Sequence, residues 1–174
     1  NYFSTMSNMS EAIMVNIAAE EQIGTWGYTP DQLKPILKNI IKSLKQNYPK
    51  IKYIEALNEP NYPGAYHGTG VVTADNVYNY YKVYYEAVNE VNAELNPSVP
   101  LQVGGPAFMY FDLTWMSAFL DDYKNDPSLD KKLDFISYHA YFTLTSSGYN
   151  MLKSDPSQVS TQRAQLDAEL SSRG

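Results

Sequence analysis

The sequence predicts an α/β fold made of parallel βαβ units. Four short apolar runs alternate with four longer amphipathic stretches, and no β-hairpin signal joins one run to the next. The runs are apolar on both faces, as expected for parallel strands that helices cover on one side and that face a filled barrel interior on the other. The 174 residues contain no internal repeat and no low-complexity linker, so we expect a single domain over residues 1–174.

The first predicted strand covers residues 12–18, and the first predicted helix covers residues 29–48. Thr29 can cap this helix, Pro30 suits its first turn, and Gln32 completes a capping box. An apolar stripe at helical spacing predicts the buried face of the helix, formed by Leu33, Ile36, Leu37, Ile40, Ile41 and Leu44.

The second predicted strand, residues 51–57, leads through a loop rich in glycine and tyrosine to a helix over residues 75–95. The chain holds 16 tyrosines, and three of them fall on the apolar stripe of this helix. We expect them to pack between helix and sheet. The stripe consists of Val77, Tyr80, Tyr81, Tyr84, Val88, Val91 and Leu95.

The second half of the chain repeats the alternation. A third strand is expected at residues 99–105, with a helix around 113–123 after it. A fourth strand is expected at residues 133–141, and a helical pattern over 158–170 completes the series.

The composition excludes several classes of partner and chemistry. The formal charge is −6 and no basic patch is present, so we expect no nucleic-acid partner. The absence of cysteine excludes disulfides, thiol nucleophiles and cysteine zinc sites. Two histidines without a partner four residues away argue against a metal-dependent hydrolase, and no metal or cofactor is expected. No apolar run approaches the ~20 residues that span a membrane, so no membrane partner is expected.

Polar residues follow the predicted strands at the ends where parallel α/β folds bind ligands. The first strand ends near Asn16, and the others end in Asn58-Glu59-Pro60, Gly104-Gly105-Pro106 and His139-Ala140-Tyr141. Carboxyl ends of parallel strands meet at one edge of the sheet. We therefore expect these groups to converge there.

Glu59 is the main candidate for chemistry. An isolated Asn-Glu-Pro is most often the first turn of a helix, where the macrodipole favours an acid. Here a buried strand leads directly into the acid, and a His-x-Tyr ends another strand. A carboxylic acid at an apolar, partly desolvated strand end keeps its proton more readily and can donate it near neutral pH.

Three motifs, EALNEPN, LQVGGPA and DFISYHAY, together resemble glycoside hydrolase clan A, and most closely its family 39 of β-xylosidases and α-L-iduronidases. The resemblance covers roughly residues 10 to 170. It implies a (β/α)8 TIM barrel, of which this chain would supply about half, as four βα units on strands three to six.

The resemblance also implies roles for individual residues. Glu59 resembles the family's general acid/base, and Asn58 matches the asparagine that holds the 2-hydroxyl of the sugar. His139 and Tyr141 match a pair on strand six that contacts the nucleophile and the bound sugar. These four residues are the expected catalytic and substrate-binding set.

Other matched positions are expected to support the site. Gly104 and Gly105 would allow close approach below the substrate, and Glu55 matches a structural glutamate. The family usually has tryptophan where this chain has Leu57, which bears on the choice of substrate. Aromatic residues in the rim loops would either stack on a sugar or cover the barrel mouth: Trp26, Tyr62 and Tyr66. His67 is a further candidate for substrate contact.

The second carboxylate of a retaining glycosidase has no counterpart in the predicted strands. In the clan it is a glutamate at the end of strand seven, and Glu169 does not match it because Glu169 lies in a helical pattern. We expect the chain to be inactive alone and the rest of the barrel to come from the same gene or from a second polypeptide.

The predicted function is that of a retaining O-glycoside hydrolase acting on β-linked oligo- or polysaccharide. The alternative is a non-catalytic carbohydrate-binding protein on the same barrel scaffold. A strand ending in glutamate shortly beyond Gly174 in the parent gene would favour the enzyme, and its absence would favour the binding protein. The expected location is secreted or extracytoplasmic.

Overall fold

The computed structural model describes residues 2–62, 66, 72–140 and 157–174. Four parallel strands form one sheet in the order β1-β2-β3-β4, which confirms the predicted parallel βαβ arrangement. The strands are β1 (Ile13–Ile17), β2 (Ile51–Ala56), β3 (Gln102–Phe108) and β4 (Phe135–Tyr138).

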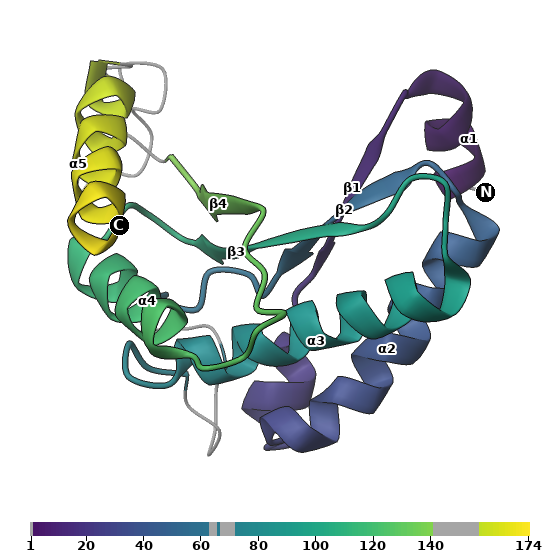
Figure 1. The fold of residues 1–174 in the computed structure, drawn as a ribbon, viewed down its shortest axis with the longest axis horizontal. Coiled ribbons are helices and arrows are strands. Elements are labelled where there is room, and N and C mark those ends of the chain that lie inside the picture. The colour runs from purple at the N-terminus through teal and green to yellow at the C-terminus, as the bar shows by residue number, and fades with distance from the viewer. Residues whose placement is uncertain (1, 63–65, 67–71, 141–156) are drawn as a thin grey trace.

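Helices lie on one side of this sheet, as Figure 1 shows for α2, α3 and α4. The four predicted helices are present, at α2 (Pro30–Asn47), α3 (Val77–Leu95), α4 (Leu113–Asn125) and α5 (Ser157–Arg173). Two further helical segments were not predicted: α1 (Tyr2–Met9) and η1 (Glu21–Thr25), a short π-helical turn after β1. Both are short, with eight and five residues, so they span too few turns for a periodic pattern to identify them.

Helix α2 begins with the predicted capping box. The Thr29 hydroxyl accepts a hydrogen bond from the Gln32 backbone N–H at 3.4 Å, and the Gln32 side chain accepts from the Thr29 N–H at 3.0 Å. The predicted apolar stripe is wrong at one position, because Ile40 is 42% exposed. Lys45 is buried instead.

The burial of Lys45 has a local cause. Its ammonium donates to the carbonyl oxygens of Pro49 at 2.7 Å and Ile51 at 2.6 Å, so the apolar stem packs while the charge stays hydrogen-bonded. Burial nevertheless lowers the pKa of the Lys45 ammonium. Hydrophobic periodicity alone could not identify this lysine as a core residue.

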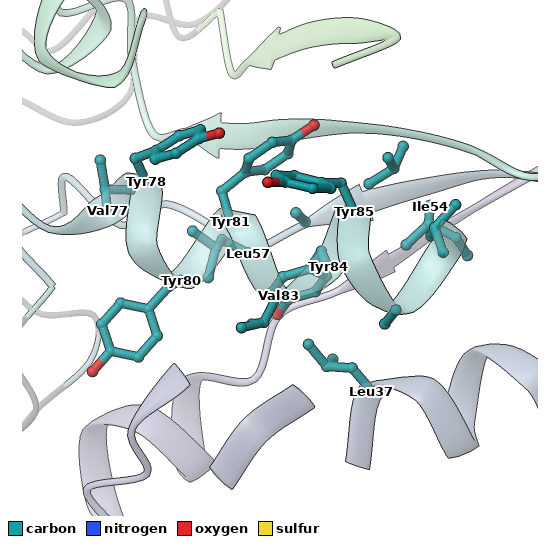
Figure 2. Close-up of a cluster of buried hydrophobic side chains, with 14 of the residues drawn as sticks. Leu37, Ile54, Leu57, Val77, Tyr78, Tyr80, Tyr81, Val83, Tyr84 and Tyr85 are labelled. Atoms are coloured by element: carbon teal, nitrogen blue, oxygen red, sulfur yellow. The ribbon is translucent and has the colours of Figure 1, made fainter. Parts of the chain in front are cut away.

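Helix α3 supplies much of the core. The predicted stripe is buried from Val77 to Val91, and only Leu95 at its end is half-buried. In Figure 2, Tyr78, Tyr81 and Tyr85 point toward the sheet. Buried tyrosine hydroxyls need partners, and here they bond to distant segments. Tyr84 donates to the carbonyl of Ile17 at 2.8 Å, at the end of β1.

Helices α2 and α3 also carry a ladder of ion pairs on their exposed flanks. Lysines of α2 and glutamates of α3 repeat every four residues, so each side chain reaches one or two partners. The residues are Lys34, Lys38 and Lys42 on α2 and Glu86, Glu90 and Glu94 on α3. Such solvent-exposed pairs contribute little to stability individually, and salt screens them.

The third strand lies further along the chain than predicted. It begins at Gln102 and continues past Pro106 to Phe108, which pairs with Tyr138 of β4. The predicted strand ended directly before Pro106, because a proline cannot donate to a strand ladder, whereas β3 continues through it. The fourth strand is shorter than predicted and ends at Tyr138, directly before His139.

The face of the sheet opposite α2, α3 and α4 is not covered by any helix in the described part of the chain (Figure 1). The strand register places Met14 beside Tyr53 and Asn16 beside Glu55, and Met14 is 50% exposed. Strands β1 and β4 form the two edges of the described sheet. Four parallel βα units of this kind fit part of a TIM barrel, and the described residues do not close it.

Within the described residues, no helix is both long enough and apolar enough to cross a membrane.

Candidate active site

Strained backbone gathers where the strands end. Residues with positive φ other than glycine are uncommon, cost of order 1 kcal/mol or more, and tend to gather at functional sites. Four such residues follow β1 and β2 or lie near the end of β3: Ala19 (φ 54°), Leu57 (φ 63°), Glu59 (φ 48°) and Ala107 (φ 53°). The carboxyl edge of the sheet therefore has the backbone features of a functional site.

Glu59 lies at this edge and not in the first turn of a helix. Its backbone N–H donates to the carbonyl of Ala107 at 2.7 Å, which ties the end of β2 to β3. Its own carbonyl accepts from the N–H of Tyr62 at 2.8 Å, which closes a tight turn. The preceding Leu57 is fully buried and anchors the turn in the core.

His139 meets Glu59 across the sheet. The Nδ1 atom of His139 lies 2.6 Å from Oε1 of Glu59, although the two residues are 80 positions apart. The His139 N–H also donates to the carbonyl of Phe108 at 2.6 Å, which fixes the backbone just after β4. The two side chains are 30% and 20% exposed, so the pair is held by protein and still reached by solvent. The structure brings these two predicted residues together.

Asn58 is held by the loop that follows β1. Its side-chain Nδ2 donates to Oε1 of Glu20 at 2.7 Å, and its backbone N–H donates to the hydroxyl of Tyr66 at 2.9 Å. The Tyr66 hydroxyl donates onward to the carbonyl of Ala18 at 3.1 Å. Burial of the ring raises the pKa of Tyr66 well above its usual range.

Sequence reasoning missed Glu20. Its only sequence signal is an acid shortly after the apolar run of β1, and that position is ordinary for a loop. Sequence reasoning also left Asn61 of the Asn-Glu-Pro-Asn run without a role. Asn61 is buried, and its Oδ1 accepts from the Met109 N–H at 2.7 Å, which joins the loops after β2 and β3.

Glu55 and Asn16 occupy adjacent register positions below Glu59. Asn16 donates through Nδ2 to Oε2 of Glu55 at 2.9 Å and to the carbonyl of Leu57 at 2.7 Å. Glu55 is thus engaged by its neighbour within the sheet. This contact fits the structural role that the resemblance implied for it.

Gly104 and Gly105 are required by the sheet itself. A Cβ on Gly104 would overlap the carbonyl oxygen and the ring of Phe135, and Gly105 has φ 151° with the Ala56 carbonyl 2.8 Å from its Cβ position. The described contacts therefore explain both glycines by strand packing. The close approach to substrate that the resemblance implied for them is not needed to account for their presence.

The rim aromatics differ in exposure. Tyr66 is buried, so it covers the core and does not offer a stacking face. Trp26 is 53% exposed and Tyr62 is 45% exposed, so both retain open faces. The predicted site residue Tyr141 and the candidate His67 lie outside the described residues.

Other acids at the periphery have structural partners. Glu169 lies in α5, where the Ser117 hydroxyl donates to it at 2.6 Å and Arg173 pairs with it at 2.7 Å. These bonds lower the pKa of the Glu169 carboxyl. Among the described residues, no three histidine, aspartate or glutamate side chains gather in a group that could hold a metal ion.

Comparison with known proteins gives one family. The model of the family described as Glycosyl hydrolases family 39 matches residues 7–167. Searches of curated proteins and of solved structures returned no match.

Proposed function

Because the chain belongs to glycosyl hydrolase family 39, we propose that it is part of a retaining O-glycosidase and supplies the general acid/base, Glu59. A carbohydrate is the substrate class that family membership implies. The observation that carries the proposal is the contact between Glu59 and His139 at the carboxyl edge of a parallel sheet. This edge is where α/β enzymes place their chemistry.

The Glu59–His139 pair suits proton transfer. One proton can lie on the carboxyl and be accepted by Nδ1, or lie on Nδ1 and be donated to the carboxylate. In the first step Glu59 would give its proton to the leaving glycosidic oxygen. In the second step the resulting carboxylate would take a proton from the attacking water. His139 would hold the Glu59 side chain between these two events.

Asn58 is proposed to bind the 2-hydroxyl of the sugar at the cleavage point. Its position next to Glu59 supports this role, because the hydroxyl lies close to the bond that is cleaved. Tyr141 is proposed as a further sugar contact on the strength of the family motif alone. The substrate is proposed to be a β-linked oligo- or polysaccharide.

The nucleophile is proposed to lie outside these residues. Retaining glycosidases need two carboxyl groups about 5 Å apart on opposite sides of the sugar. The open four-stranded sheet supports the view that further strands, from the same gene or a second polypeptide, complete the barrel and supply the second carboxylate.

A secreted or extracytoplasmic location is part of the proposal, because a polysaccharide does not cross a membrane. Detection of the protein in the culture medium or outside the cytoplasmic membrane of source cells would support it. Confinement of the protein to the cytosol would contradict it.

The test of the proposal uses Glu59→Gln in the enzyme with its complete barrel. The change keeps the shape of the side chain and removes its transferable proton. We expect kcat/KM to fall about 10²- to 10⁴-fold for alkyl or sugar leaving groups, and much less for dinitrophenol, which leaves without protonation.

Glu21→Gln is the matched control, because it removes the same charge from an exposed residue. Activity close to wild type is expected for it. An equal loss on both types of leaving group in Glu59→Gln, with glycosylation rate-limiting, would contradict the acid/base role. A wild-type protein that binds sugars and hydrolyses none of them would point to the carbohydrate-binding alternative.

A further inference from the structure

Glu20 lies beside the proposed sugar-binding residue, and neither the family motifs nor the proposed mechanism gives it a role. We infer that Glu20 is a positioning residue that sets the orientation of the Asn58 carboxamide. The inference rests on the proposed function, because it concerns how Asn58 meets a sugar hydroxyl.

The orientation follows from the chemistry of the two groups. An ionised carboxylate only accepts hydrogen bonds, whereas a carboxamide presents a donor on one side and an acceptor on the other. The 2.7 Å contact with Oε1 of Glu20 therefore requires the Asn58 nitrogen on that side. The Asn58 oxygen then faces the opposite direction. A charged acceptor holds this arrangement more firmly than a neutral one.

The backbone around both residues is fixed independently. The Asn58 N–H is bound to the buried Tyr66 hydroxyl, which in turn is bound to Ala18, two residues before Glu20. Ala19 has φ 54°, and this left-handed residue directly precedes Glu20, which is the N-cap residue of η1. A strained residue in the loop after β1 therefore lies directly before the carboxylate that binds Asn58.

This geometry has a specific consequence for substrate recognition. One N–H of Asn58 is used by Glu20, so one N–H and Oδ1 remain in fixed directions for a sugar hydroxyl. Without Glu20, the carboxamide can turn over and present the wrong atom. The loss should therefore appear in the recognition of that hydroxyl and not in the binding of the rest of the sugar.

The experiment compares Glu20→Ala with wild type in the enzyme with its complete barrel. The measured quantity is the ratio of kcat/KM for a glycoside to kcat/KM for its 2-deoxy analogue. We expect this ratio to fall about tenfold in Glu20→Ala. Glu20→Gln should give a ratio between those of wild type and Glu20→Ala, since its amide oxygen still accepts but its amide group can also turn over and donate. The exposed neighbour Glu21→Ala removes the same charge and should leave the ratio unchanged.

Coupling to Asn58 separates positioning from a general structural effect. In an Asn58→Ala background, Glu20→Ala should lower the ratio no further, because the residue that it orients is gone. An additional full loss in that background, or an unchanged ratio in Glu20→Ala alone, would overturn the inference. If Glu20→Ala does not fold, the same comparison is made with Glu20→Met, whose side chain has a similar length and no oxygen to accept the hydrogen bond.

A second readout does not depend on activity. In the NMR spectrum of the wild type, one Asn58 Nδ2 proton should be shifted downfield and exchange slowly with water, and Glu20→Ala should abolish both properties. Unchanged Asn58 signals would overturn the inference even in an active enzyme. If the wild type has no glycosidase activity, the proposed function fails, while this spectrum still decides whether Glu20 orients Asn58.

Discussion

At the scale of single residues, Gly104 shows how one absent side chain shapes the sheet. The ring of Phe135 lies over Gly104 and meets the ring of Tyr53 edge-on, with centroids 6.0 Å apart. Any side chain at position 104 would occupy the space of the Phe135 ring and backbone. The aromatic pair on the uncovered face can therefore form only because residue 104 has no side chain.

We expect Gly104→Ala to lower the free energy of unfolding by about 2 kcal/mol or more, because the overlapping Phe135 carbonyl belongs to the backbone and cannot rotate away. Urea denaturation followed by circular dichroism measures the change. Ser98→Ala, at an exposed position after α3, serves as the control and should change stability little. Equal stability of Gly104→Ala and wild type would show that the two strands separate more easily than the geometry implies.

At the scale of secondary-structure elements, Asp126 joins α3 to the segment after α4. Its buried carboxylate accepts from the hydroxyls of Tyr78 at 2.7 Å and Tyr85 at 2.6 Å, and Lys82 lies 3.1 Å away. Burial by itself would raise the pKa of this carboxyl. The hydrogen bonds from Tyr85, Tyr78 and Ser128 outweigh burial and hold the pKa far below its usual range.

Asp126→Asn should therefore lower the free energy of unfolding at neutral pH by about 2–3 kcal/mol, because bonds to a charged acceptor become bonds to a neutral one. The pKa of Asp126 is lower in the folded state than in the unfolded state. Its contribution is therefore complete above the ordinary value of 3.8 and is lost progressively as the pH falls below it.

Denaturation at several pH values checks this expectation. The gap between wild type and Asp126→Asn should be constant from pH 5 to pH 7 and should shrink below about pH 4. The exposed Asp130→Asn in the same region is the control and should change little. A gap that persists unchanged at acid pH would mean that the charge of Asp126 is not what holds α3 to this segment.

At the scale of the whole molecule, the described sheet has an uncovered face and two strand edges. Strand edges present unpaired N–H and C=O groups that readily bind other chains. On the uncovered face Met14 is 50% exposed, and the rings of Tyr53 and Phe135 are half-buried against each other. Both features fit part of a TIM barrel, in which further strands are expected on either side.

We expect the 174-residue chain by itself to show no glycosidase turnover. A covalent glycosyl-enzyme needs a nucleophile opposite the proton donor, and the proposal assigns that nucleophile, and part of the wall that would hold the sugar in the attack geometry, to residues outside this chain. Mixing the chain with the remaining strands as a second polypeptide should restore hydrolysis of an aryl glycoside. The same mixture made with the Glu59→Gln chain should stay inactive on an alkyl glycoside. Hydrolysis by the purified chain alone, abolished by Glu59→Gln, would show that the nucleophile lies within these residues.

The sequence by itself determined the order and type of the main elements. Amphipathic periods located α2 and α3, and the capping box of Thr29 and Gln32 was predicted correctly, because these signals depend on neighbours a few residues apart. The family motifs likewise identified Glu59 and His139 as candidates, since both lie within three residues of a strand end. A sequence pattern predicts a structural feature correctly when the contacts that cause the feature join residues close together in the sequence.

Only the tertiary structure decided which residues meet. The burial of Lys45, the continuation of β3 past Pro106 and the contact of Glu20 with Asn58 all depend on groups from other elements. The 2.6 Å contact of Glu59 with His139 joins residues 80 positions apart, and no pattern in either segment specifies it. Parallel strands bring their carboxyl ends to one edge, but the register of the sheet and the left-handed turns decide which side chains touch there.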